Sequence, residues 1–306
     1  MKAKKLVHPA LFLVAAFYAG NFTVAKIIMP SIIQPFGFVL TRVAVAGFFI
    51  LLFHALFIRE KVKSWKDLAL LFVCSFFGVT LNTMLFFKGL SLTTPINASV
   101  MMITAPIFVV VFAGVYLKER VSGRKIFGIL LGLIGAFFLI AGNSLTFSSD
   151  NTTGNLLVAL NAMSYATYLV LVKPLLTKYN PITIVKWSFI FGFMMILPFS
   201  YNEFMAVDWF HLDPTSWWSI AYVIFGITIF AYLANAWALT YVNSSVVGAY
   251  IFLQPVLATI IATLAGSDTL TLRKSLLSIL VILGVYLVSV TREQFINIKT
   301  FVLNKL

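Results

Sequence analysis

The chain contains Phe77-Gly78-Val79-Thr80 and, nearly half a chain later, Phe225-Gly226-Ile227-Thr228. The segment from Tyr18 to Lys26 is similarly echoed from Tyr165 to Lys173. Further matches are Pro106 with Pro255, Glu119 with Asp268, Arg124 with Arg273, and Gly135 with Gly284. Each copy holds five long apolar segments, so it begins and ends on opposite sides of a membrane. The second copy is therefore inverted relative to the first, an arrangement typical of alternating-access transporters.

The composition requires a lipid environment. The chain has 306 residues, of which 61% are hydrophobic and only 10% charged, with a mean hydropathy of +1.02. A water-soluble domain carries about 25% charged residues, so this chain lacks the polar surface to cover a soluble globule. We predict an all-α integral membrane protein, because a helix satisfies its own backbone hydrogen bonds in lipid.

Ten apolar segments approach the ~20 residues that a membrane-spanning helix needs. The predicted spans are 9–29, 33–57, 68–88, 95–117, 124–142, 154–172, 182–201, 216–239, 244–265 and 274–291. They divide the chain into a first five-helix repeat (1–143), an outer linker (144–153), a second five-helix repeat (154–292) and a cytoplasmic tail (293–306). The first segment is too long for a signal peptide and has a counterpart in the second half, which favours a retained span.

The basic residues predict the orientation. The formal net charge is +13, and most of the 22 Lys and Arg residues fall between spans on one side, together with both termini. Basic residues accumulate on the cytoplasmic side of membrane proteins. We therefore predict a multi-pass protein of the cell (inner) membrane with both termini cytoplasmic. The clusters form no basic stripe with interleaved aromatic residues, which argues against nucleic-acid binding.

Several motifs resemble one known group of membrane proteins. They are Asn21 to Lys26, Arg42, Ala98 to Pro106, Tyr116-Leu117-Lys118-Glu119-Arg120, Ala166 to Lys173, and Ala249 to Pro255. With these residues the chain resembles the drug/metabolite transporter superfamily, in its EamA-type family of ten-span permeases, over nearly its whole length. The second copy departs from the pattern, since Ser267-Asp268 replaces the Glu-Arg motif. The resemblance implies export or uptake of small metabolites, including amino acids, through a central cavity between the halves.

The acidic residues bear on energy coupling. All nine fall in loops or at span ends, so no carboxylate lies in mid-membrane to build a proton relay. The small four-span relatives that exchange drugs for protons use a first-span Glu, which has no match here. A nucleotide-binding Gly-x-x-x-x-Gly-Lys-Ser/Thr loop is also missing from the sequence. These features favour facilitated diffusion or exchange.

Polar and aromatic residues within spans are the candidates for substrate binding, since unpaired polar groups in hydrocarbon are costly. Arg42 could pair with a substrate carboxylate, or it could be a structural residue that binds carbonyls or extends to the interface. The amides should face a cavity or another helix, and the aromatic residues could line the cavity, pack internally or face lipid. The predicted substrate-binding residues are Tyr18, Asn21, Arg42, Asn82, Asn161, Tyr165, Tyr168, Asn235, Trp237, Tyr250 and Gln254.

Two other residue types suggest motion and packing. Pro106 and Pro255 occupy equivalent places in spans four and nine, so they could be gating hinges or static kinks. Gly128, Gly132 and Gly135 in span five permit close helix contact, either within the chain or in a homodimer.

These features predict a secondary transporter of small metabolites, an exporter of amino acids or related compounds that works by alternating access. Its expected partners are a small-molecule substrate and the lipid bilayer. The alternatives are an efflux permease for drugs or toxic compounds and an intramembrane enzyme. Three His residues and no buried acid supply no catalytic cluster, so we predict no enzyme activity, catalytic residue, metal or cofactor.

Overall fold

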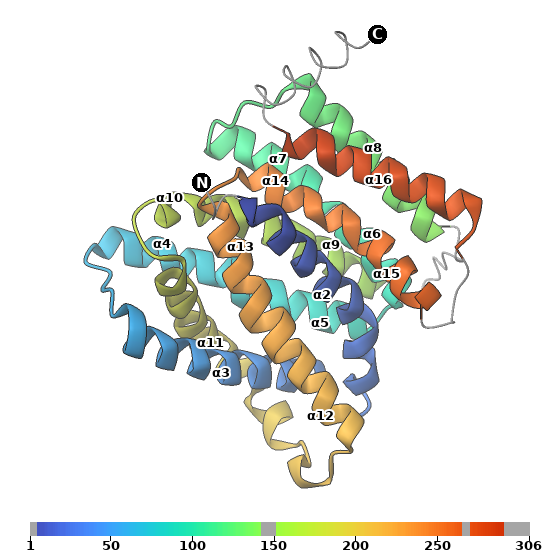
Figure 1. Cartoon of the computed structure of the whole chain (residues 1–306). Coiled ribbons are helices and arrows are strands. Elements are labelled where there is room, and N and C mark those ends of the chain that lie inside the picture. Colours follow the sequence, from blue (N-terminus) through green and yellow to red (C-terminus); the bar gives the residue numbers. More distant parts are fainter. Residues whose placement is uncertain (1–4, 142–150, 265–269, 291–306) are drawn as a thin grey trace, which may run out of the picture.

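A computed structural model describes residues 5–141, 151–264 and 270–290 (Figure 1). Ten helices in these ranges are long and apolar enough to cross a membrane. They cover Val7–Ile28, Pro35–Ile58, Trp65–Ser91, Pro95–Tyr116, Gly123–Ile140, Thr152–Leu176, Pro181–Met205, Pro214–Leu239, Ser244–Leu264 and Leu272–Ser289. The predicted all-α fold with ten spans is confirmed. The predicted tail 293–306 and most of the predicted linker 144–153 lie outside the described residues.

The five spans of each repeat differ in continuity. The first repeat contains α2 (Val7–Ile28), α3 (Pro35–Phe53) with η1 (His54–Ile58), α4 (Trp65–Ser75) with η2 (Phe76–Leu81) and α5 (Asn82–Ser91), α6 (Pro95–Met102) with α7 (Ala105–Tyr116), and α8 (Gly123–Ala141). The second contains α9 (Thr152–Leu171) with α10 (Lys173–Leu176), α11 (Pro181–Met205), α12 (Pro214–Ala221) with η5 (Tyr222–Phe230) and α13 (Ala231–Leu239), α14 (Ser244–Ala249) with η6 (Tyr250–Phe252) and α15 (Leu253–Leu264), and α16 (Leu272–Ser289).

Short loops end in residues that cap the N-terminus of the next helix. Thr94 accepts a hydrogen bond from the Asn97 amide, and Asn180 caps its helix in the same way. A proline, Pro95 or Pro181, follows each cap. Such a proline fits the first helical turn, where its missing N–H removes no helical hydrogen bond. The sequence thus sets where these spans begin.

The two repeats pack against each other in symmetry-related pairs. The fifth and tenth spans meet through α8 and α16, and the second and seventh through α3 and α11. Contacts of α9 with α5 and α7 have counterparts in contacts of α2 with α13 and α15. In Figure 1, α8 and α16 lie side by side at one edge of the molecule, while α2, α9 and α13 cross its middle. The first and sixth spans are therefore repeat-related central helices.

Four spans are interrupted near their middles, a feature that the hydropathy pattern does not reveal. The repeated tetrapeptides fall in π-helical segments, the first in η2 and the second in η5. The fourth span breaks between α6 and α7 just before Pro106, and the ninth passes through the 3-10 turn η6 before Pro255. Broken helices are tolerated in membranes where their freed backbone groups find protein partners or a cavity. Each repeat has these breaks in its third and fourth spans.

The glycines of the fifth span pack inside the chain. A Cβ at Gly128 would lie 2.8 Å from the Gly284 carbonyl oxygen, and one at Gly135 would lie 2.8 Å from the Val281 side chain. A Cβ at Gly132 would meet the ring of Phe252 at 2.6 Å. These glycines permit close contact with α16 and η6 within the chain. The predicted homodimer contact through the fifth span stays a prediction.

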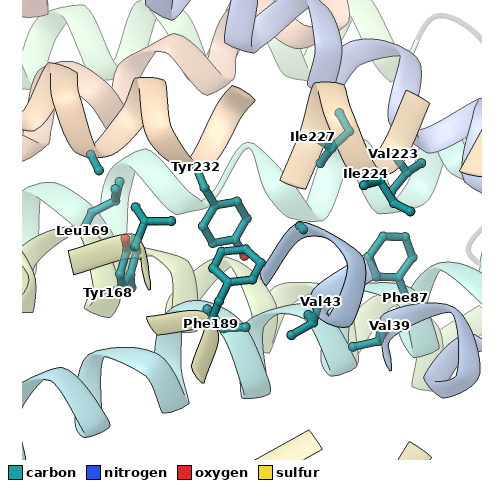
Figure 2. Packing of buried hydrophobic residues seen from close by; sticks show 14 of the residues in the cluster. Val39, Val43, Phe87, Tyr168, Leu169, Phe189, Val223, Ile224, Ile227 and Tyr232 are labelled. Carbon is teal, nitrogen blue, oxygen red and sulfur yellow. The ribbon is translucent and has the colours of Figure 1, made fainter. Parts of the chain in front are cut away.

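The interior joins both repeats. Figure 2 shows Val39 and Val43 of α3 near Phe87 of α5, with Phe189 of α11 against Tyr232 of α13. The rings of Phe189 and Tyr232 are 5.3 Å apart and nearly perpendicular. Large apolar side chains also cover the outside, which suits a lipid-facing surface. This packing leaves the polar side chains of the central helices facing inward.

Candidate functional site

A cavity lies among the central helices at the level of the interruptions. It contains about 570 Å³ of space free of protein atoms, including space open to the outside. Both repeats contribute to its wall. The lining residues are Tyr18, Asn21, Phe22, Arg42, Asn82, Thr83, Phe86, Met102, Asn161, Tyr165, Ile227, Tyr232, Ile251 and Gln254.

Seven of the eleven predicted substrate-binding residues line this cavity: Tyr18, Asn21, Arg42, Asn82, Asn161, Tyr165 and Gln254. An eighth, Asn235, lies beside it and donates through Nδ2 to the hydroxyls of Tyr18 (3.4 Å) and Tyr165 (3.3 Å). These tyrosines hold equivalent positions in the two repeats. Their convergence on one amide places the cavity where the repeats meet.

The other three predicted residues lie elsewhere. Tyr168 is buried in the core, and its ring contacts Gly78 so closely that a Cβ there would lie 2.3 Å away. Trp237 packs against Tyr241 with ring centroids 5.3 Å apart. The hydroxyl of Tyr250 makes a 2.7 Å hydrogen bond with Nδ1 of His8. None of the three lines the central cavity.

Side chains of the second repeat satisfy backbone carbonyls at the π-helical segment of the first. The hydroxyl of Ser164 donates to the Phe77 carbonyl at 2.7 Å, and Tyr232 donates to the Gly78 carbonyl at 2.8 Å. Nδ2 of Asn161 donates to the carbonyl of Asn82 at 2.6 Å. The repeated tetrapeptide of the first half is therefore tied to the second repeat at the wall of the cavity.

Arg42 is the only basic side chain among the cavity-lining residues. Its Nε donates to the hydroxyl of Thr228 at 2.8 Å, and its guanidinium carbon lies 4.9 Å from the centre of the Phe87 ring. Thr228 is oriented by its own hydrogen bond to the carbonyl of Val223, five residues earlier. The second copy of the tetrapeptide thus holds Arg42 through its threonine.

Sequence reasoning missed several residues of the site. Thr228 had a usable signal, because it belongs to the repeated tetrapeptide. Met102 and Ile251 had none, since they are ordinary apolar residues placed at the cavity by the breaks in the fourth and ninth spans. Pro106 and Pro255 follow these breaks directly but do not line the central cavity.

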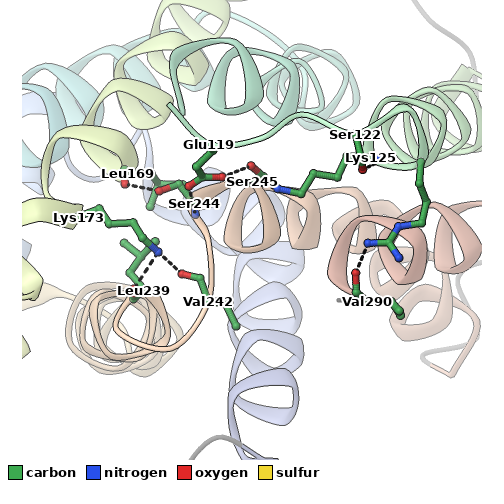
Figure 3. A network of polar contacts seen from close by, with 11 residues as sticks. Glu119, Ser122, Lys125, Leu169, Lys173, Leu239, Val242, Ser244, Ser245 and Val290 are labelled. Carbon is green, nitrogen blue, oxygen red and sulfur yellow. Dashed lines mark hydrogen bonds and ion pairs between the residues drawn. The ribbon is translucent and has the colours of Figure 1, made fainter. Parts of the chain in front are cut away.

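Polar contacts join the two repeats at one end of the molecule (Figure 3). Glu119, after α7, accepts hydrogen bonds from the Ser244 amide at 3.1 Å and the Ser245 hydroxyl at 2.7 Å. Lys125 lies 3.7 Å from the same carboxylate. This is the predicted cytoplasmic end, and the contact joins the fourth span to the start of the ninth.

Two repeat-related lysines bind the ends of neighbouring spans. Nζ of Lys26 donates to the carbonyl of Ser91 at 3.3 Å, at the end of the third span. Nζ of Lys173 donates to Leu239 at 3.2 Å and also to Val242, after the eighth span (Figure 3). The position of both lysines at helix C-termini complements the partial negative charge there.

A second hollow adjoins the central cavity and shares Phe22 and Gln254 with it. It contains about 760 Å³ of empty space among the first, fourth, fifth and ninth spans. Most of its wall is apolar, with Thr23, Ser99 and Thr259 adding hydroxyls. In the described part of the chain, no three His, Cys, Asp or Glu side chains come together to hold a metal ion.

Comparisons with known proteins agree with this architecture. A model described as the EamA-like transporter family matches residues 6–141 and 152–290. An "uncharacterized transporter" of Archaeoglobus fulgidus is 28% identical over 278 residues, covering 91% of this chain and 96% of the relative. The "uncharacterized transporter YetK" of Bacillus subtilis is 26% identical over 218 residues, covering 70% of this chain and 66% of the relative.

A solved crystal structure also matches, with a TM-score of 0.75 and 16% identity, over 94% of this chain and 96% of that one. At this identity the match shows a shared fold. Because the family model covers both halves of the chain, this multi-pass membrane protein belongs to the EamA-like transporter family.

Proposed function

We propose that this transporter is a secondary carrier that exports amino acids or related small metabolites by alternating access. One observation carries the proposal: a polar cavity between two inverted repeats that meet at Tyr18, Tyr165 and Asn235. Inverted repeats commonly rock around a fixed central site. The breaks beside that site, before Pro106 and Pro255, supply points where the spans can bend.

The contact of Glu119 with Ser244 and Ser245 supports a cavity that opens away from the cytoplasm in this structure. The cavity residues Arg42 and Phe86 lie in the halves of their spans remote from the predicted cytoplasmic ends, whereas Glu119 joins the repeats at those ends. We assign the structure to a state closed toward the cytoplasm. The termini would then face the cytoplasm at the cell (inner) membrane, and tags at either end should resist protease added to intact spheroplasts.

Cationic-drug efflux is less consistent with the site. Arg42 already places a positive charge in the cavity, and no acidic residue lines it. A cationic solute would add a like charge at close range. Without a carboxylate for a proton relay, facilitated diffusion or exchange remains the proposed mode of transport.

The test is counterflow in proteoliposomes with a labelled panel of aromatic, aliphatic and sulfur-containing amino acids, nucleosides and sugars. We expect saturable exchange of the amino-acid class. Met102→Trp should block it by filling the cavity, whereas Met194→Trp should not, because Met194 is 63% exposed on the lipid-facing side. Equal exchange by both variants, or exchange of no solute by folded wild-type protein, would refute the proposal.

A further inference from the structure

The acidic side chains in the described part of the chain are all bound away from the cavity. Each accepts a hydrogen bond from a backbone amide or a side chain near a helix end. These residues are Glu60, Asp67, Glu119, Glu203, Asp208 and Asp213. None of them contacts Arg42, so its charge has no carboxylate partner among the described residues.

The burial of Arg42 makes its lack of a carboxylate partner energetically unfavourable. The residue is 3% exposed, and Nε is the one guanidinium nitrogen with a hydrogen bond to the described residues. Phe87 offers a ring face, which compensates a cation only partly. An uncompensated charge at this depth is unfavourable. The free Nη groups can therefore gain most from an anion that enters the cavity.

We propose that Arg42 binds the carboxylate of the substrate, and that the substrate is a neutral α-amino acid in its zwitterionic form. This inference rests on the proposed transport function and names its substrate class. The planar guanidinium presents paired N–H donors that match a carboxylate. Thr228 holds the group through Nε, which leaves the Nη edge available.

Neutral acceptors are available for the amino group. The amide of Gln254 lines the cavity and has no hydrogen bond within the described residues, and the side chain of Asn82 is similarly free. Amide carbonyls accept N–H donors. A substrate without an amino group would leave these acceptors unsatisfied, whereas one with a net positive charge would face Arg42.

The adjoining hollow suits an apolar side chain. Phe22 and Gln254 line both this hollow and the central cavity, and Ala19, Ala258 and Ile96 form part of its apolar wall. A substrate held by its carboxylate at Arg42 and its amino group at Gln254 can extend its side chain past these two residues. The apolar wall of this hollow would favour apolar over charged side chains.

The first test compares matched analogues with the wild-type protein. L-leucine, L-methionine and L-phenylalanine are each compared with the corresponding amide and des-amino acid, by titration calorimetry and by competition in counterflow. Loss of the carboxylate should weaken binding about 10- to 100-fold, the equivalent of a charge-assisted hydrogen bond. Loss of the amino group should weaken it less, since its proposed acceptors are uncharged.

The second test changes the protein instead of the substrate. Arg42→Gln should remove the preference for acid over amide, whereas the matched control Arg59→Gln, at the exposed end of η1, should keep it. If Arg42→Gln does not fold, the wild-type analogue series decides alone. Amides that bind as tightly as acids, or exchange restricted to nucleosides or sugars, would overturn this inference while leaving transport intact. Absence of any exchange would instead refute transport itself.

Discussion

Replacement of Gly284 by alanine tests the packing of the two peripheral spans. A Cβ at this position would lie 2.5 Å from the Gly132 nitrogen, 2.6 Å from the Gly128 oxygen and 2.9 Å from the Gly132 Cα. All three are backbone atoms, so no side-chain rotation relieves the overlap. The shortest distance must rise to at least 3.0 Å, which moves α16 away from α8. Such overpacking costs about 1–3 kcal/mol.

Thermal unfolding of the purified protein in detergent measures this cost. Gly284→Ala should lower the midpoint by roughly 2–12 °C, given the usual scaling for chains of a few hundred residues. Gly123→Ala is the matched control, because no atom lies within 4 Å of its added Cβ. The reasoning fails if Gly284→Ala unfolds at the wild-type temperature, and especially if it separates a native dimer instead. The glycines would then contact a second copy rather than each other.

Three further changes test the site and its supports. Thr228→Val removes the acceptor that orients Arg42, so calorimetric affinity for a carboxylate substrate should fall about tenfold, and the buried Nε left without its acceptor should lower the melting temperature as well. Glu119→Ala leaves the Ser244 amide without its acceptor and should destabilise the protein by about 1–3 kcal/mol in thermal unfolding; an unchanged midpoint would contradict this. The Ser216 hydroxyl and amide lower the pKa of Asp213 from its ordinary value of 3.8, so this contact stabilises the protein above that pH and is lost as the pH falls through the lowered pKa. In the Asp213→Asn variant, the melting temperature should therefore fall less steeply as the pH is lowered from about 6 to 2.

The spans could be predicted because hydropathy and length are properties of a continuous segment. A lysine near the start does not interrupt a span: Lys186 lies in the second turn of α11 and Lys274 in the first turn of α16. The repeat also predicted which helices would be equivalent. It could not predict the π-helical segments, because matching Phe77 with Phe225 says nothing about how many residues occupy each turn.

The site was only partly predictable for the same reason. A π-helical turn rotates all later side chains relative to a regular helix. Tyr232 and Trp237 follow the same segment, η5, but only Tyr232 reaches the cavity. Sequence alone identified polar residues such as Asn161 that need a partner. It could not determine the direction in which each aromatic ring of a central helix points.

The unpaired charge of Arg42 has an electrical consequence. When an alternating-access carrier changes state, the voltage across the membrane falls over the closed side of its cavity. The charge of Arg42 therefore stabilises the state in which the empty cavity is open toward the negative side. The free energy of this effect is at most about 2.3 kcal/mol for each 100 mV. A bound zwitterion adds no net charge, so the loaded cavity is drawn the same way. A negative interior should accordingly favour the return of the empty carrier and oppose the outward step of the loaded one, so that Arg42 would make turnover sensitive to membrane potential even for a substrate with no net charge.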